Sequence, residues 1–538
     1  MLVLNEQGLK DRAAWEKKGY SLPRFDRAAM IRHTRECPVW VHFGAGNICR
    51  AFQCNAVQRM LNEGRMQSGL IVVEGFDYEI VEKGYRPCDD YSLLVTLRSD
   101  GSVEKTVIGS IAESCILDSA NEKEFSHLKD LFRHPSLQMV SFTITEKGYS
   151  LVNAQGDTLP AVARDFADGP AQPVSYIGKV ASLLYARYQA GGAPIAMVSM
   201  DNCSHNGEKL RGAVTAFARA WRDGGFLQYL ESERVSFPWT MIDKITPRPD
   251  PSVEALLRED GLQGLEPVIT GKNTYIAPFV NAEESEYLVI EDDFPNGRPA
   301  LEDAGFIFTD RDTVNRVERK KVCTCLNPLH TALAVYGCLL GYTRISEEMK
   351  DPDLVNLIRR VGYTEGLPVV TDPGVIDPKS FIDTVVSVRL PNPFMPDAPQ
   401  RIATDTSQKL AIRFGETIKA YQASDALDPR QLQAIPLVLA GWLRYLMAVD
   451  DRGQPFALSS DPLLDTVCPF VADFRLGDVP EQAVIREKLL PLLQNAAVFG
   501  VDLTRVGLAD TVCADFAKLI AGPGAVRRTL KAQADPSM

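Results

Sequence analysis

A strand-like segment that runs directly into a glycine-rich turn most constrains how this chain can fold. Residues 38–43 are apolar and β-forming. Five residues then form a turn and open the next segment: Gly44, Ala45, Gly46, Asn47 and Ile48. A strand, a Gly-x-Gly turn and a helix in this order place a pyrophosphate on a helix N-terminus. We therefore expect a dinucleotide-binding turn, although Gly-x-Gly alone also occurs in ordinary turns and Cys49 replaces the third glycine of the usual fingerprint.

Two acidic residues follow the next strand-like segment, residues 70–73. They are Glu74 and Asp77. Carboxylates at this place in a dinucleotide-binding fold bond the ribose hydroxyls of NAD and repel the 2′-phosphate of NADP. The sequence therefore predicts NAD as the cofactor.

The order of the remaining segments predicts two domains, as the length of 538 residues also indicates. Strand-like and helical segments alternate up to about residue 300, a pattern typical of a doubly wound parallel sheet. Leu- and Ala-rich helical segments with Pro-containing loops follow. We expect an α/β Rossmann-like domain at residues 1–304, with a hairpin inserted at residues 91–111, and a mostly α-helical catalytic and substrate domain at residues 305–538. Residues 534–538 are expected to be a frayed tail.

Composition and charge exclude several classes of function. The net charge of −12 argues against nucleic-acid binding, which requires a basic surface. The longest apolar stretch, residues 435–449, contains Arg444 and is too short to span a membrane. The N-terminus lacks the apolar region of a signal peptide, and eleven irregularly spaced cysteines suggest reduced thiols. We expect a cytoplasmic protein, a monomer or small homo-oligomer, that binds a small molecule and neither nucleic acid nor membrane.

The segment from residue 318 to residue 336 brings together three side chains suited to acid–base chemistry. Lys321, Asn327 and His330 lie within ten residues, in largely apolar surroundings. Partial burial can lower the pKa of a lysine toward neutrality, as a general base requires. The alternative is an ordinary buried helix with a solvent-facing lysine and a hydrogen-bonded histidine. Cys323 and Cys325 lack the spacing of a metal site, so no metal is expected.

A further candidate follows the strand-like residues 195–200. Ligands of open α/β sheets bind beyond the carboxyl ends of the strands, where Asn202 is expected to lie. An asparagine at this place can equally cap the next helix or form a turn.

Several ordered blocks of sequence resemble the long-chain polyol dehydrogenase family, also called the mannitol dehydrogenase family. The resemblance covers nearly the whole chain, and its blocks are residues 44–51, 143–149, 199–207, 241–247, 291–299, 321–330 and 401–409. It implies an NAD-dependent, metal-independent oxidoreductase that acts on a sugar acid or polyol. The block around Lys321 is most similar to the mannonate oxidoreductase branch. We therefore expect reduction of D-fructuronate to D-mannonate, with tagaturonate reduction and mannitol oxidation as alternatives.

The resemblance also implies roles for individual residues. Asn202 and Asn327 hold the carbonyl or alkoxide oxygen, and Lys321 transfers the proton. His330 bonds a neighbouring hydroxyl and Glu318 relays protons to solvent. Three further residues complete the expected set: Thr145 at the cofactor, and Arg389 and Lys409 as candidates for the cation that binds a uronate carboxylate.

The spacing of the catalytic segment departs from the family pattern by one residue. Lys321 precedes Asn327 by six positions, where the family has five, although Glu318 keeps its spacing to Lys321. Pro328 falls within the expected helix, so we predict a kink or π-bulge that absorbs the extra residue and returns Asn327 and His330 to the face of Lys321. The shifted Lys321 and the missing third glycine are also compatible with a chain that binds NAD or a sugar acid without turnover, as a sensor or scaffold.

Overall fold

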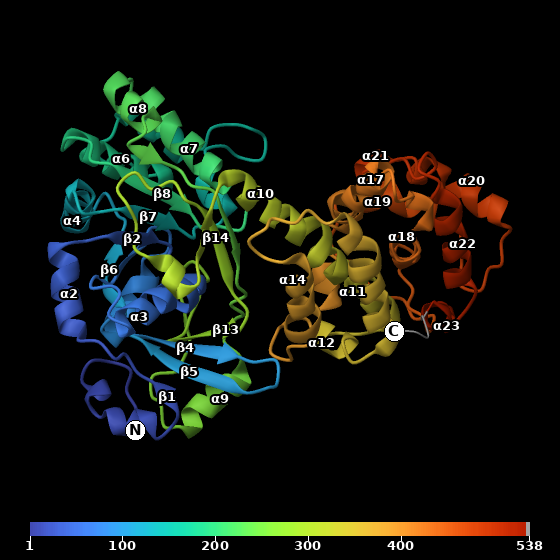
Figure 1. Ribbon diagram of the computed structural model, residues 1–538, viewed down its shortest axis with the longest axis horizontal. Coiled ribbons are helices and arrows are strands. Elements are labelled where there is room, and N and C mark those ends of the chain that lie inside the picture. Colours follow the sequence, from blue (N-terminus) through green and yellow to red (C-terminus); the bar gives the residue numbers. More distant parts are fainter. Residues whose placement is uncertain (534–538) are drawn as a thin grey trace. The chain divides into compact units, whose positions relative to one another are not determined.

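The chain folds into two compact units, Met1–Asn315 and Arg316–Met538, in a computed structural model that describes residues 1–533 (Figure 1). The expected tail at residues 534–538 lies outside the described residues. The division falls beyond the predicted boundary at 304/305. The reason is β15 (Ile307–Thr309), which pairs in parallel with β14 (Tyr287–Glu291) and so belongs to a sheet of the first unit.

A six-stranded sheet forms the centre of the first unit. Its strand order is β6-β3-β2-β7-β8-β9, and every neighbouring pair is parallel. The strands are β2 (Trp40–Phe43), β3 (Leu70–Glu74), β6 (Ile111–Ile116), β7 (Met139–Phe142), β8 (Ile195–Ser199) and β9 (Val235–Ser236). From β2 the chain adds strands first on one side and then on the other, which is the doubly wound order of a Rossmann fold. The predicted fold class is confirmed, and the switch point for a dinucleotide lies between β2 and β7.

Helices cover both faces of this sheet, so its central strands are buried on both sides, as parallel sheets require. Apolar residues of α4 (Glu122–Arg133), α6 (Tyr176–Gln189) and α7 (Asn206–Ala220) form one core with the sheet (Figure 1). Residues of α2 (Arg27–Glu36) and α3 (Cys54–Asn62) contribute to the other. The other helices of this unit are α1 (Arg12–Glu16), α5 (Pro160–Asp168), α8 (Gly224–Glu231) and α9 (Pro251–Glu259).

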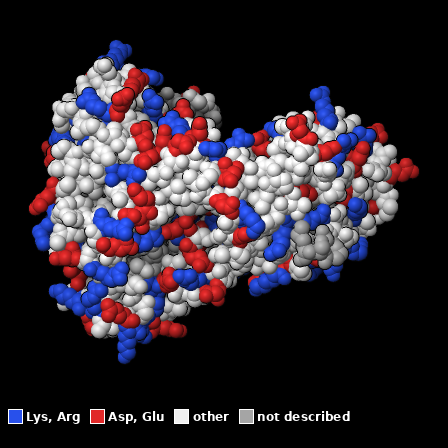
Figure 2. Space-filling model, viewed as in Figure 1, with Lys and Arg blue, Asp and Glu red and all other residues white. Residues whose placement is uncertain are grey.

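The predicted hairpin is part of a larger accessory sheet. β4 (Ser92–Leu97) and β5 (Val103–Ile108) pair antiparallel, and β1 (Tyr20–Ser21) and β13 (Phe279–Glu283) extend them to the order β1-β5-β4-β13. β10 (Thr240–Asp243) joins β14 and β15 in a third sheet, and β11 (Val268–Ile269) pairs with β12 (Tyr275–Ile276). On the face of the first unit that Figure 2 shows, acidic and basic side chains are intermingled.

The second unit is built from helices around α11 (Asn327–Leu340) and α18 (Ala434–Tyr445), which are almost wholly buried. The other helices from α10 onward are α10 (Arg311–Lys320), α12 (Ile345–Glu348), α13 (Pro352–Arg359), α14 (Pro378–Thr384), α15 (Pro399–Ile402), α16 (Thr406–Leu410), α17 (Glu416–Ala423), α19 (Leu464–Val467), α20 (Gln482–Leu493), α21 (Ala496–Phe499), α22 (Ala509–Ile520) and α23 (Ala525–Ala532). One helical run, Arg311–Leu340, is long and apolar enough to cross a membrane. However, 78% of its most apolar window is buried within the protein, which is typical of a core helix.

Candidate active site

The glycine turn after β2 has the backbone conformation that the sequence predicts. Gly44 has φ +110°, and a Cβ atom there would lie 2.2 Å from the carbonyl oxygen of Thr143, so only glycine fits. No atom lies within 4 Å of a Cβ built on Gly46, so the turn is open where a pyrophosphate would approach. The chain becomes helical at Asn47. A cradle with these properties fits a bound dinucleotide.

The helix that follows the turn is irregular at the place of the missing third glycine. Cys49 is fully buried and begins a π-helical segment, η2 (Cys49–Gln53). The side chain of Asn47 accepts a hydrogen bond from Nη2 of Arg50 at 2.8 Å, and Nη1 of Arg50 donates to the carbonyl of Ala277 at 2.8 Å. The start of the helix is therefore fixed by Arg50.

The two predicted ribose-binding carboxylates have partners within the protein. Glu74 accepts hydrogen bonds from the backbone N–H of Ala45 at 3.0 Å, of Phe76 at 2.7 Å and of Asp77 at 3.0 Å. Asp77 is buried and accepts a hydrogen bond from Oγ1 of Thr270 at 2.6 Å. Glu74 thus holds the glycine turn and keeps acceptor capacity for a further donor. The ribose contact of both residues stays a prediction.

The loop after β7 is held by a carboxylate that sequence reasoning missed. Asp201 accepts hydrogen bonds from the backbone N–H of Ile144 at 2.9 Å and of Thr145 at 2.8 Å, and from the hydroxyl of Tyr149 at 2.5 Å. Thr145 has φ +65° and ψ 160°, a conformation that a non-glycine residue adopts only when its surroundings enforce it. Burial raises the pKa of Asp201, and these hydrogen bonds oppose the shift.

Asn202 lies beside this anchor, in the turn between β8 and α7, where it is exposed. It therefore stands at the carboxyl edge of the same sheet as Gly44 and Thr145, as predicted. The nearby Asn206 is the buried asparagine of this turn, and its amide nitrogen donates to the carbonyls of Asp201 at 2.9 Å and Thr240 at 3.1 Å. Asn206, the first residue of α7, thus fixes the end of this turn, and the role of the exposed Asn202 stays a prediction.

The predicted bulge is present in the catalytic segment of the second unit. A π-helical segment, η7 (Lys321–Cys325), separates α10 from α11, and the backbone N–H of Leu326 bonds the carbonyl of Lys321 at 3.2 Å, five residues back. Such a turn absorbs one residue. Pro328 lies in the first turn of α11, where its missing N–H is tolerated, and not inside a continuous helix as predicted.

The predicted acid–base residues flank this π turn. Lys321 is 6% exposed, and Asn327, His330 and Glu318 are half-buried. Lys320 is fully buried, its Nζ lying 3.2 Å from the carbonyl oxygen of Ile376 and 4.5 Å from the ring centre of Phe381. The side chain of Lys320 is therefore part of the packing of the second unit.

A second carboxylate that the sequence did not reveal stands beside His330. Nε2 of His330 lies 3.4 Å from Oδ2 of Asp397, and this buried nitrogen has no hydrogen-bond partner among the described residues. Asp397 also pairs with Arg401. Burial opposes ionisation of Asp397, but His330 and Arg401 outweigh it and lower its pKa. The imidazole is thus oriented by Asp397, while Nε2 can still form a hydrogen bond.

Cations cluster near the first turn of α11. Lys409, at the end of α16, donates from Nζ to the carbonyl of Thr404 at 2.5 Å, and burial together with the neighbouring Arg413 lowers its pKa. Arg413, in η11 (Ala411–Gly415), donates to Oγ1 of Thr331 at 2.5 Å, and burial lowers its pKa to about 10. No carboxylate among residues 1–533 forms an ion pair with Arg413. The sequence did not indicate a role for this arginine. Arg389 ends η10 (Val385–Arg389) and is buried.

Comparison with known proteins assigns the class of both units. Residues 39–303 match the "Mannitol dehydrogenase Rossmann domain", and residues 313–519 match the "Mannitol dehydrogenase C-terminal domain". The chain therefore belongs to the mannitol dehydrogenase family, as its sequence blocks indicated, and is an oxidoreductase with a dinucleotide-binding Rossmann domain.

Several individual proteins of this family are similar to the chain over most of its length. The chain is 50% identical over 535 residues to the "D-mannonate oxidoreductase" of Thermotoga maritima, a match that covers 98% of each protein. It is 31% identical to the "Polyol:NADP oxidoreductase" of Gluconobacter oxydans, over 79% of this chain and 83% of that protein. The structure of Pseudomonas fluorescens mannitol 2-dehydrogenase with NAD and D-mannitol matches with a TM-score of 0.67 and 27% identity, covering 99% of both chains.

Proposed function

We propose that this protein interconverts D-fructuronate and D-mannonate with NAD(H). The observation that carries the proposal is the 50% identity over 98% of the chain with a protein named D-mannonate oxidoreductase. Nε2 of His330, which makes no hydrogen bond among the described residues, and Arg413, which donates to the neighbouring Thr331, are polar groups that an open-chain sugar acid requires.

The choice of NAD rests on the first unit. Glu74 lies at the carboxyl end of β3 and bonds the glycine turn, so its negative charge stands where a 2′-phosphate would be repelled. Relatives of this chain include both an NADP oxidoreductase and an enzyme bound to NAD. A direct comparison of NADH and NADPH is therefore the test of this assignment.

The reaction requires a proton donor and acceptor and a site for the oxygen. The nicotinamide, when bound, supplies or accepts the hydride. Lys321 protonates the oxygen that becomes the alcohol and removes this proton in the reverse direction. Asn327 donates a hydrogen bond to that oxygen without forming a salt bridge in the ground state, and the resemblance to the family assigns the same role to Asn202 of the first unit. His330 binds a neighbouring hydroxyl through Nε2, and Glu318 relays protons to solvent.

The substrate carboxylate distinguishes a uronate from a polyol. A buried guanidinium without a carboxylate partner is costly unless a ligand neutralises it. Arg413 is half-buried, forms no ion pair with a carboxylate among the described residues, and donates to Thr331, the residue after His330. We assign the carboxylate to Arg413 together with Lys409, and keep the buried Arg389 as the alternative from the sequence.

The test is NADH consumption with fructuronate, tagaturonate and fructose at equal concentration. We expect fructuronate to be fastest, NADPH to be a poor substitute and EDTA to leave the rate unchanged. A faster rate with tagaturonate or fructose would contradict the proposed substrate and indicate another activity of the family. A change in NADH fluorescence without turnover of any of the three sugars would support a non-catalytic binding protein.

A further inference from the structure

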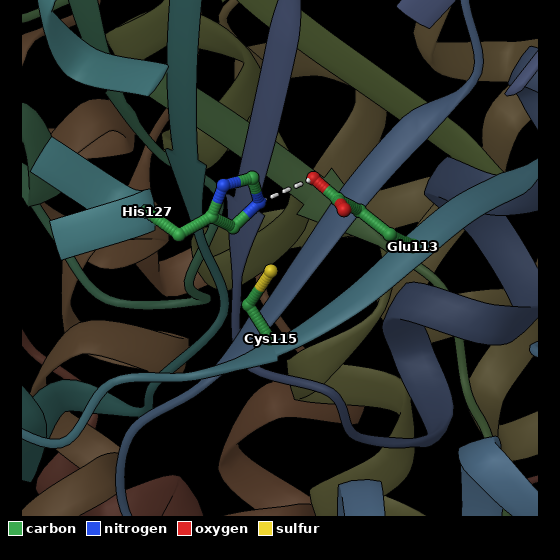
Figure 3. A group of neighbouring side chains, drawn as sticks. All are labelled: Glu113, Cys115 and His127. Atoms are coloured by element: carbon green, nitrogen blue, oxygen red, sulfur yellow. Dashed lines mark hydrogen bonds and ion pairs between the residues drawn. The ribbon is translucent and has the colours of Figure 1, made fainter. Parts of the chain in front are cut away.

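Three potential metal ligands meet at the edge of the Rossmann sheet, away from the switch point. Glu113 and Cys115 lie on β6, and His127 lies on α4 (Figure 3). Nε2 of His127 is 2.9 Å from Oε1 of Glu113, and one donor atom from each of the three residues lies within 4.8 Å of the others. None of the three has a role in the proposed reaction.

The fold directs all three side chains to one place. Glu113 and Cys115 are two residues apart on a strand, so they project from the same face. Leu70 pairs with Ile111 and Ile71 pairs with Glu113, which leaves Ala112 as an extra residue in a β-bulge. A bulge re-aims the side chains beside it, and bulges concentrate next to functional sites.

The helix α4 supplies the third ligand from the covering layer. Cys115 shares an apolar core with Phe125 and Leu128 of α4, and this packing brings the helix turn with His127 over the strand. The side chain of His127 is 43% exposed and that of Glu113 is 21% exposed, whereas Cys115 is buried. An ion from solvent can therefore enter on the side of the imidazole and carboxylate.

The donor set matches the chemistry of zinc. Imidazole nitrogen, thiolate sulfur and carboxylate oxygen are the three zinc ligands of proteins, and metal–ligand bonds of about 2.0–2.3 Å in a tetrahedron place donor atoms about 3.4–3.6 Å apart. The His127–Glu113 contact of 2.9 Å would open slightly, and the sulfur, within 4.8 Å, would approach by at most about 1.4 Å. The half-exposed imidazole can make this adjustment.

Nearby charge also favours a cation. Glu124 lies one turn before His127 on α4, and its carboxylate pairs with Arg86 at 2.7 Å and accepts from the backbone N–H of Ile116 at 3.4 Å. It therefore adds negative charge beside the three ligands, part of which Arg86 compensates.

We propose that Glu113, Cys115 and His127 bind one Zn²⁺, with water as the fourth ligand, and that the ion ties α4 to the edge strand β6. Binding releases the thiol proton of Cys115 and any proton on Nε2 of His127 to solvent, so that both can ligate. The site lies at β6, two strands from the turn that follows β2, so it is separate from the proposed dinucleotide site. The alternative is a surface His–Glu pair beside an inert cysteine.

The first experiment titrates metal-free full-length protein with Co²⁺ and records the absorbance of the thiolate-to-cobalt charge-transfer band. We expect one equivalent to bind with tetrahedral d–d bands. Cys115→Ser should remove the charge-transfer band, whereas Cys468→Ser, which changes a half-buried cysteine of the second unit, should retain it. No band in the parent, or a band that persists in Cys115→Ser, would overturn the proposal.

A second measurement covers the case in which Cys115→Ser does not fold. His127→Ala changes a half-exposed side chain and should fold. Zn²⁺ should raise the thermal unfolding midpoint of the parent and of Cys468→Ser, but not of His127→Ala. NADH oxidation should be unchanged in His127→Ala. The zinc site and the proposed reaction are therefore tested independently of each other. An equal shift of the midpoint in all three proteins would mean adventitious binding and refute the site.

Discussion

Glu348→Gln should change how the stability of the second unit depends on pH. Glu348 ends α12, is fully buried, and neither carboxylate oxygen has a hydrogen-bond partner among the described residues. Oε1 faces Gly337 of α11 so closely that a Cβ there would lie 2.1 Å away. Burial, with a smaller contribution from Asp351, raises the pKa of Glu348 to about 9.

The sign and size of the effect follow from this pKa. Above about pH 4.5 the unfolded chain has released the proton of Glu348, whereas the folded protein keeps it up to about pH 9. The folded state thus binds more protons, and stability falls as pH rises through this window. One pH unit corresponds to about 1.4 kcal/mol, so the loss between pH 5 and pH 8 is roughly 4 kcal/mol. The amide side chain of the Glu348→Gln variant cannot ionise, so the variant escapes this loss.

The assay is urea unfolding of the parent and of Glu348→Gln at pH 5, 6, 7 and 8, followed by circular dichroism. Other titrating groups are common to both proteins and cancel in the difference. We expect the free energy of unfolding of the variant, relative to the parent, to rise by roughly 4 kcal/mol from pH 5 to pH 8. A difference that stays constant with pH would show that Glu348 is ionised in the folded protein and refute the reasoning.

Three further predictions concern the site. Lys321→Ala should lower kcat by several orders of magnitude while NADH binding, measured by fluorescence titration, is retained. Lys320→Ala should instead lower the melting temperature and keep turnover in the folded fraction. The reverse pattern would mean that the base is Lys320. Asp201→Ala leaves two backbone N–H groups without a hydrogen-bond acceptor, so we expect the free energy of urea unfolding to fall by roughly 2–6 kcal/mol and NADH binding to weaken. Unchanged NADH affinity would exclude a positioning role for Asp201. Gly44→Ala should abolish NADH binding because the turn has no room for a Cβ, whereas Gly212→Ala in α7, where a Cβ meets no atom, should bind NADH normally; normal binding by Gly44→Ala would contradict the assignment of the turn.

Local signals in the sequence were sufficient for the main sheet. The glycine turn and the alternation of strands and helices predicted the Rossmann order because each βα unit is specified by neighbouring residues. Of the accessory sheets only the hairpin of β4 and β5 was predicted, since β1, β11, β12 and β15 have two or three residues each, too few to form a recognisable pattern. For the same reason, β15 escaped notice and the predicted boundary fell before the observed division.

The candidate site shows the same limit. The extra residue between Lys321 and Asn327 was enough to predict a bulge, because this spacing is a local property of the chain, whereas Pro328 lies in the first turn of α11 and not inside the helix as expected. Asp397 and Arg413 were missed because they meet His330 and Thr331 only through the tertiary fold, more than sixty residues along the chain. Asp201 was visible beside Asn202, but no pattern in the sequence links its carboxylate to the amides of the β7 loop.

The π-helical turn at residues 321–325 allows the segment to gain or lose one residue without disturbing the helix that follows. A single-residue insertion in a regular helix rotates everything beyond it by about 100°. A π turn confines that rotation to five residues, so the apolar packing of α11 against α18 is left as it was. Removal of Val322, which is half-buried, would by the same reasoning contract the turn to a regular helix and shorten the interval between Lys321 and Asn327 to five. Length variation is thus accommodated beside the reacting groups, and a search that fixes the number of residues between lysine and asparagine would overlook chains of this kind.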